Sequence, residues 1–157
     1  NKVLDDLELF EFLSSNGYAL GTDFIVGHPG ETPEIWREAI QNLHKFPLTH
    51  IHAFTYSKRD GTPSASMKDI VKGDIAKDRY IELVEIIKQK NYEFRQNIKN
   101  NKVKLEVLVE QEKNGKYLGF DQFFNQVEIS SNEDLVSDWL NLEDYEVEFN
   151  KNEARFK

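Results

Sequence analysis

The spacing of apolar residues changes its period once along this 157-residue chain, near Asn100-Asn101. Before this point, apolar residues recur every three to four positions in segments separated by short continuous apolar runs, which predicts helices alternating with strands. After it, apolar and polar residues alternate, which predicts strands with one buried face. We therefore expect an α/β domain over residues 1–101 and a small all-β domain over residues 102–157.

The first part has the pattern of helix, strand, helix, strand and a final long helix. Helical spacing covers residues 3–13, 33–43 and 74–100, and two short apolar runs rich in β-branched residues cover 18–27 and 49–56. The continuous run over 18–27 is typical of a strand that is buried on both faces. Strand, helix and strand joined by short links predict a right-handed parallel unit.

The second part carries several short strand signals. Val103, Leu105, Val107 and Val109 recur at every second position, with Lys104, Glu106 and Glu110 among the residues between and after them. Asn114-Gly115 is a strong hairpin signal. Further strands are expected at Tyr117–Phe120, Gln126–Ile129 and Tyr145–Phe149. These segments predict a small antiparallel sheet or barrel.

Cysteine is absent, so this polypeptide cannot by itself provide disulfides, thiolate nucleophiles or thiolate ligands to a cluster. The chain starts at Asn1 inside a helical pattern, and we therefore expect it to begin within a longer protein. No apolar stretch is long enough to span a membrane and no export leader is apparent, which favours a cytoplasmic location.

Negative charge is concentrated in the second part. Residues 103–157 contain six Lys and Arg against thirteen Asp and Glu, so 6 − 13 = −7 of the total −8 lies there. Affinity for nucleic acid depends largely on Lys and Arg. An acidic β domain is therefore not expected to hold a phosphate backbone by charge.

Candidate chemistry lies in the two loops that follow the parallel strands, residues 27–31 and 56–63, because parallel α/β folds bind ligands at the C-terminal ends of strands. Gly27 and Gly30 would let the backbone approach a planar ligand closely. The alternative is that these glycines only form a tight turn and that Glu31 is a solvated carboxylate. Spacing alone leaves both interpretations open.

Histidines and a charged cluster are further candidate ligands. His50 and His52 share one face of a predicted strand and could bind a metal, but no third ligand is near and a packing role is favoured. His28 reads as a loop residue rather than a base. The Lys58-Arg59-Asp60 cluster could hold a phosphate or be solvated, and its position on the loop favours binding.

Two segments at these loops resemble the tRNA methylthiotransferases, a family of radical S-adenosylmethionine enzymes. They are GTDFIVGHPGE (residues 21–31) and YSKRDGTPSA (residues 56–65). The family typically has a TD-I-VG-PGE strand and turn followed, about two dozen residues later, by a YS-R-GTPA segment. The resemblance implies that the strands are the fifth and sixth of a partial TIM-like radical SAM barrel, and that residues 102–157 form a TRAM-like β barrel.

The resemblance also implies a binding site for the adenine end of S-adenosylmethionine. Its expected residues are Ile25, Gly27, Glu31, Phe54, Thr55 and Tyr56, of which the first three match an I-x-G-x-x-E signature. Lys58 and Arg59 would face the substrate entrance and hold an RNA phosphate. We also expect RNA contact at Lys77 and Arg79, with base stacking on Tyr117 or Phe120 as the way for the acidic domain to contribute.

In the complete enzyme, the family's 4Fe-4S clusters and S-adenosylmethionine would serve to add a methylthio group to C2 of an adenosine beside the tRNA anticodon. Their cysteine ligands would precede Asn1, so the resemblance implies no catalytic or metal-binding residue in this chain, which alone is catalytically incomplete. The segment Leu20–Asp23, at the start of the first motif, is more similar to the family members whose substrate is N6-threonylcarbamoyladenosine. Arg59 and Pro63 favour tRNA over a ribosomal protein as the substrate. Isopentenyladenosine as the substrate and a non-catalytic α/β binding module are the alternatives.

Overall fold

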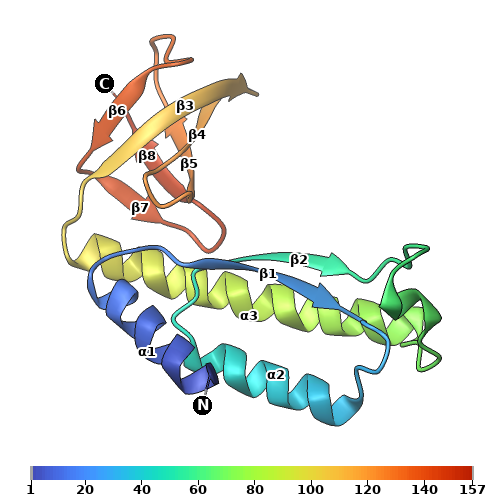
Figure 1. Cartoon of the computed structure of the whole chain (residues 1–157). Helices are drawn as coiled ribbons and strands as arrows, with labels where there is room; N and C mark the ends of the chain where they lie inside the picture. Colours follow the sequence, from blue (N-terminus) through green and yellow to red (C-terminus); the bar gives the residue numbers. More distant parts are fainter. Residues whose placement is uncertain (1, 157) are drawn as a thin grey trace. The chain divides into compact units, whose positions relative to one another are not determined.

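The fold is described from a computed structural model that covers residues 2–156 (Figure 1). The chain forms two compact units, Asn1–Lys90 and Asn91–Lys157. The division falls inside helix α3 (Gly73–Asn100), ten residues before the end of that helix. The domain boundary expected between residues 101 and 102 is a different kind of boundary, between two domains of the family, and it remains a prediction.

The first unit follows the predicted order of elements. Its elements are α1 (Lys2–Ser15), β1 (Gly21–Val26), α2 (Pro33–Lys45), β2 (His50–Thr55), the short 3-10 helix η1 (Pro63–Ser66) and the first turns of α3. Strands β1 and β2 pair in parallel, which confirms the parallel unit. The sheet has only these two strands among the described residues, so the partial TIM-like barrel remains a prediction.

Local sequence explains where α2 begins. The hydroxyl of Thr32 accepts a hydrogen bond from the backbone N–H of Ile35, and Pro33 occupies the first helical turn. The helix then buries Trp36 and Leu43 in a core that also contains the following residues: Val26, Leu48, Leu83 and Ile87. Residues from all three helices thus cover one face of the two strands.

The other face of this sheet is open, which corrects the prediction that the first strand is buried on both faces. Ile25 and Phe54, which are partners across the strands, are 55% and 52% exposed. Asp23 and His52 pair on the same face, with Nδ1 of His52 3.7 Å from the Asp23 carboxylate. The physical reason is that the helices cover only the side that carries Phe24 and Val26.

The second unit is a curled six-stranded sheet (Figure 1). Its strands are β3 (Leu105–Lys113), β4 (Lys116–Phe120), β5 (Gln126–Ser130), β6 (Trp139–Leu142), β7 (Tyr145–Val147) and β8 (Asn152–Arg155). The order is β6-β3-β4-β5-β8-β7, and the expected hairpin at Asn114-Gly115 joins β3 to β4 with positive φ angles at both residues. A curled sheet of this kind is compatible with a TRAM-like β domain.

The sheet is mixed, not antiparallel as predicted. Strands β5 and β8 run in parallel, whereas the other pairs are antiparallel. The long connection between β5 and β8, which includes β6 and β7, lets the chain return in the same direction. Alternate residues of β3 fill the core, with Leu105, Val107 and Val109 fully buried. Within residues 2–156, no helix is long and apolar enough to cross a membrane.

Candidate functional site

The loop between β1 and α2 is shaped by two glycines in the left-handed region. Gly27 has φ of 79° and Gly30 has φ of 88°. A Cβ at Gly27 would lie 2.8 Å from the Cβ of Ala76 in α3. Glycine at position 27 therefore lets helix α3 pack closely against the loop. The turn also requires the positive φ angle, which glycine adopts without strain.

Glu31 lies behind this loop and is not a solvated carboxylate, whereas the tight-turn interpretation of the glycines stays open. Its side chain is 10% exposed. Its two carboxylate oxygens lie 3.2 and 3.3 Å from the backbone nitrogen of Gly27, which donates to them. Nη1 of Arg79 donates to the same carboxylate at 2.5 Å and to the Glu31 carbonyl at 3.0 Å.

Arg79 is part of this buried group, so the expectation that it contacts RNA is wrong. The residue is 7% exposed, and its guanidinium lies 5.5 Å from the centre of the Trp36 ring. Nε1 of Trp36 donates to Glu82 at 2.7 Å. The arginine turns inward because α3 passes the β1–α2 loop, where a buried carboxylate needs a cation.

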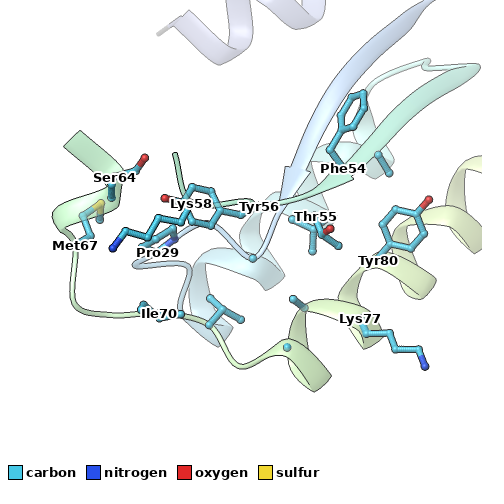
Figure 2. Close-up of a pocket in the computed structure, with 17 residues that line it drawn as sticks. Pro29, Phe54, Thr55, Tyr56, Lys58, Ser64, Met67, Ile70, Lys77 and Tyr80 are labelled. Carbon is cyan, nitrogen blue, oxygen red and sulfur yellow. The ribbon is translucent and has the colours of Figure 1, made fainter. Parts of the chain in front are cut away.

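A hollow of about 770 Å³ lies beside β2 at the ends of the strands (Figure 2). Its lining includes five of the residues expected from the sequence: Gly27, Phe54, Thr55, Tyr56 and Lys58. Lys77, expected to contact RNA, also borders it. The sequence did not identify Met67, Ile70 and Tyr80, because the segment before α3 has no regular pattern and helical spacing does not show which face of α3 meets a hollow.

A second hollow, of about 400 Å³, lies at the same strand ends and brings in two further expected residues, Ile25 and Arg59. Thr55 and Tyr56 line both hollows, and His28 lines the smaller one. Seven of the eight expected binding residues thus gather here, and Glu31 lines neither hollow. No group of three metal-ligating side chains occurs among the described residues.

Tyr56 carries a polar atom without a partner at this site. Its hydroxyl is buried and has no hydrogen-bond partner within residues 2–156, while its ring meets the His28 ring edge at 5.2 Å. An unsatisfied buried hydroxyl costs about 1–3 kcal/mol. A ligand that offers both a hydrogen-bonding group and an apolar surface fits these residues, since Phe54 in the larger hollow and Ile25 in the smaller one supply exposed apolar side chains.

Exposed aromatic residues lie on the second unit. Phe120, expected to stack on bases, is 42% exposed, whereas Tyr117 packs partly against the core. Phe124 and Trp139 are 79% and 69% exposed and were not identified from the sequence. The turn that carries Phe124 is closed by Asp121, which accepts from backbone nitrogens two and four residues later.

The relatives found by comparison with known proteins are named for methylthio-group chemistry. No protein-family model matches the chain. A protein of Helicobacter pylori (strain J99) named as a methylthiotransferase is 42% identical over 156 residues, which is 99% of this chain and 37% of that protein. The threonylcarbamoyladenosine tRNA methylthiotransferase MtaB of Bacillus subtilis (strain 168) is 28% identical over 143 residues, 89% of this chain and 32% of that protein.

A third relative is the tRNA-2-methylthio-N6-dimethylallyladenosine synthase of Thermobifida fusca (strain YX). It is 41% identical over 91 residues, which is 58% of this chain and 18% of that protein. The chain spans less than two fifths of the length of each of these relatives.

Proposed function

Because the chain belongs to the methylthiotransferase family, we propose that it is the C-terminal part of a radical S-adenosylmethionine enzyme that modifies tRNA. In this proposal β1 and β2 belong to the cofactor-binding barrel, and residues 102–157 occupy the place of the TRAM domain. The observation that carries it is the gathering of seven candidate residues in two hollows at the strand ends, among them Tyr56 with its unpartnered hydroxyl.

S-adenosylmethionine, when bound, would supply the radical and methyl chemistry of the reaction. The residues of this chain would bind and orient it. Ile25 and Phe54 offer apolar surface to the adenine, and Thr55 and Tyr56 offer backbone and hydroxyl groups. Glu31 does not border either hollow, and its part in cofactor binding is indirect, through the Gly27 amide.

The ligands of the 4Fe-4S clusters would be cysteines in a part of the enzyme outside this sequence, since the sequence has no cysteine. The chain alone would then bind no cluster and would be catalytically incomplete. A cytoplasmic location, where tRNA is modified, belongs to the same proposal. The rival is a non-catalytic α/β binding module, and the absence of a C-x-x-x-C-x-x-C motif upstream in the gene would favour it.

The proposed substrate is N6-threonylcarbamoyladenosine beside the tRNA anticodon. The name of the Bacillus subtilis relative, which aligns with most of this chain, supports this choice. Isopentenyladenosine is the alternative, supported by the similarity to the Thermobifida fusca protein over 58% of the chain. Mass spectrometry of nucleosides from tRNAs incubated with the full-length protein decides between them, because the two methylthiolated products differ in mass.

The proposed RNA contact is at the rim formed by Lys58, Arg59 and Lys77. Each phosphate contact contributes roughly 0.7 to 0.9 to the slope of log K against log salt. Replacing Lys58 and Arg59 by Gln in the full-length protein should therefore weaken tRNA binding and flatten that slope by about 1.5. The matched control is the double change Lys45→Gln and Lys88→Gln, which removes two exposed cations elsewhere in the first unit.

Deleting residues after Val103 should change the salt slope little. If that deletion abolishes salt-dependent tRNA binding while the double change at Lys58 and Arg59 leaves it intact, the β unit is the main RNA-binding surface and the proposed contact is wrong.

A further inference from the structure

Arg79 is connected to the candidate cofactor site through one peptide group. The peptide between Val26 and Gly27 ends strand β1. Its N–H donates to the carboxylate of Glu31, and its C=O accepts from the backbone N–H of Tyr56 at 2.8 Å. The N–H of this peptide is therefore held by Glu31, and its C=O holds the backbone of Tyr56, which is one of the residues that line both hollows.

Glu31 is itself held in place by Arg79. The side chains are 8% and 10% exposed, so neither charge is well solvated. Removing one partner from a buried ion pair leaves an uncompensated charge, and the remaining side chain then moves toward water or takes up a proton. Without Arg79, the carboxylate would lose the contact that keeps it directed at the Gly27 amide.

Three elements fix the direction of the Arg79 guanidinium. It lies over the Trp36 ring of α2, and that ring is oriented by the hydrogen bond from Nε1 to Glu82 of α3. Its second contact, with the Glu31 carbonyl, ties it to the backbone of the β1–α2 loop as well as to the carboxylate. A guanidinium with two contacts on one residue is a directional support, which a point charge is not.

We propose that Arg79 is a positioning residue of the cofactor site. Through Glu31 it fixes the Val26–Gly27 peptide, and through that peptide it fixes the end of β2 at Tyr56, so that both hollows keep the shape that binds S-adenosylmethionine. This inference rests on the proposed function. It assigns Arg79 no contact with the cofactor or with RNA.

The test uses the full-length protein with its clusters and compares Arg79→Met, Arg79→Lys and the control Lys88→Gln, which changes an exposed cation of the same helix. Arg79→Met should raise the Kd for S-adenosylmethionine at least about tenfold and raise KM, with kcat at saturating cofactor within about twofold of the original. Arg79→Lys, which keeps a charged donor nitrogen but not the planar guanidinium, should recover part of the affinity. Lys88→Gln should change nothing.

Hydrogen exchange resolved to single amides provides a readout without the cofactor. Arg79→Met should speed the exchange of the Gly27 and Tyr56 amides in protein that remains folded, and Lys88→Gln should not. A merely structural role would lower Tm with an unchanged Kd and unchanged exchange at these two amides. That result would overturn the proposal.

If Arg79→Met fails to fold, the double change Glu31→Gln and Arg79→Met replaces it, since it leaves no unpaired buried charge. The double variant should fold and still bind the cofactor more weakly, because the amide side chain lacks the directional support. Cofactor affinity equal to that of the original would overturn the proposal. If the original full-length protein binds no S-adenosylmethionine at all, the proposed function itself fails, whereas the exchange of Gly27 and Tyr56 still reports the coupling to Arg79.

Discussion

The contact between Gly27 and Ala76 can be measured as a free energy. Gly27→Ala adds a Cβ 2.8 Å from that of Ala76, at a residue with φ of 79°. The left-handed backbone costs an alanine about 1–2 kcal/mol, and the overpacked contact adds about 1–3 kcal/mol. Ala76→Gly removes the neighbouring Cβ and costs about 1 kcal/mol for glycine in a helix.

The four proteins of this double-mutant cycle separate the two costs. If the contact is as close as the structure has it, the double variant should be more stable than the sum of the single changes by about 1–3 kcal/mol. Gly17→Ala is the matched control, because Gly17 has φ of 84° and no atom within 4 Å of its missing Cβ. That change should cost only the backbone term of about 1–2 kcal/mol.

Urea unfolding followed by the fluorescence of Trp36 gives these free energies for the first unit. The measurement uses a Trp139→Phe background, because the chain has two Trp and the other one, 69% exposed, lies in the second unit. Additive effects of Gly27→Ala and Ala76→Gly, within about 0.5 kcal/mol, would refute the close approach of α3 to the loop.

Three further changes test separate features. Arg95→Met should destabilise the second unit by at least about 3 kcal/mol in urea unfolding, because the buried guanidinium donates to the carbonyls of three residues between β7 and β8. Hydrogen bonding from Lys151 lowers the pKa of Glu128 in the folded protein below its ordinary value of 4.5. The ionised Glu128 therefore stabilises the fold fully above pH 4.5, and this stabilisation is lost as the pH falls through the lowered pKa. Glu128→Gln should flatten the dependence of Tm on pH in this acidic range. Tyr56→Phe should leave unfolding unchanged or raise its free energy by about 1 kcal/mol, yet weaken cofactor binding in the full-length protein, and an unchanged Kd would exclude a ligand contact by the hydroxyl.

Local signals were sufficient to predict most of the first unit. The cap at Thr32 and the apolar periodicity located α2, and the two β-branched runs located β1 and β2. The open face could not be predicted in the same way, because Ile25 and Phe54 are apolar whether or not another part of a protein covers them. A continuous apolar run indicates that two faces can be covered, not that both are.

The strands missed in the second unit had weak signals. Strand β8 has the sequence NEAR, and three of its four residues are polar or charged. It pairs with β5 across a long connection, and such pairing depends on tertiary contacts rather than on alternation. Strand β6 has only Leu140 and Leu142 buried, next to the exposed Trp139. Four residues are too few for a period of two to be distinguished from chance.

The candidate site was predicted by motif, but the roles of its charged residues depended on burial. Arg79 and Lys77 are two positions apart on α3, and from the sequence both were basic residues available to RNA. The structure buries Arg79 and leaves Lys77 at the rim of the larger hollow with Lys58. A helix places residues two apart on different faces, so only one of the two could point toward the β1–α2 loop.

Ion pairs in the second unit strengthen the argument against its binding RNA by charge. Lys104 pairs with Glu143, and Lys116 and Lys151 both approach Glu128. Lys151 also pairs with Glu153, so these two lysines and two glutamates form a neutral group, as do Lys104 and Glu143. A paired lysine gives little net attraction to a phosphate, so the excess of carboxylates over residues 103–157 is not offset. With Arg79 buried, three cations remain at the rim of the first unit, and their phosphate contacts can account for a salt slope of roughly −2 to −3. A steeper slope in the full-length protein would require further cations, either other exposed lysines of this chain such as Lys68 and Lys72 or residues outside this sequence.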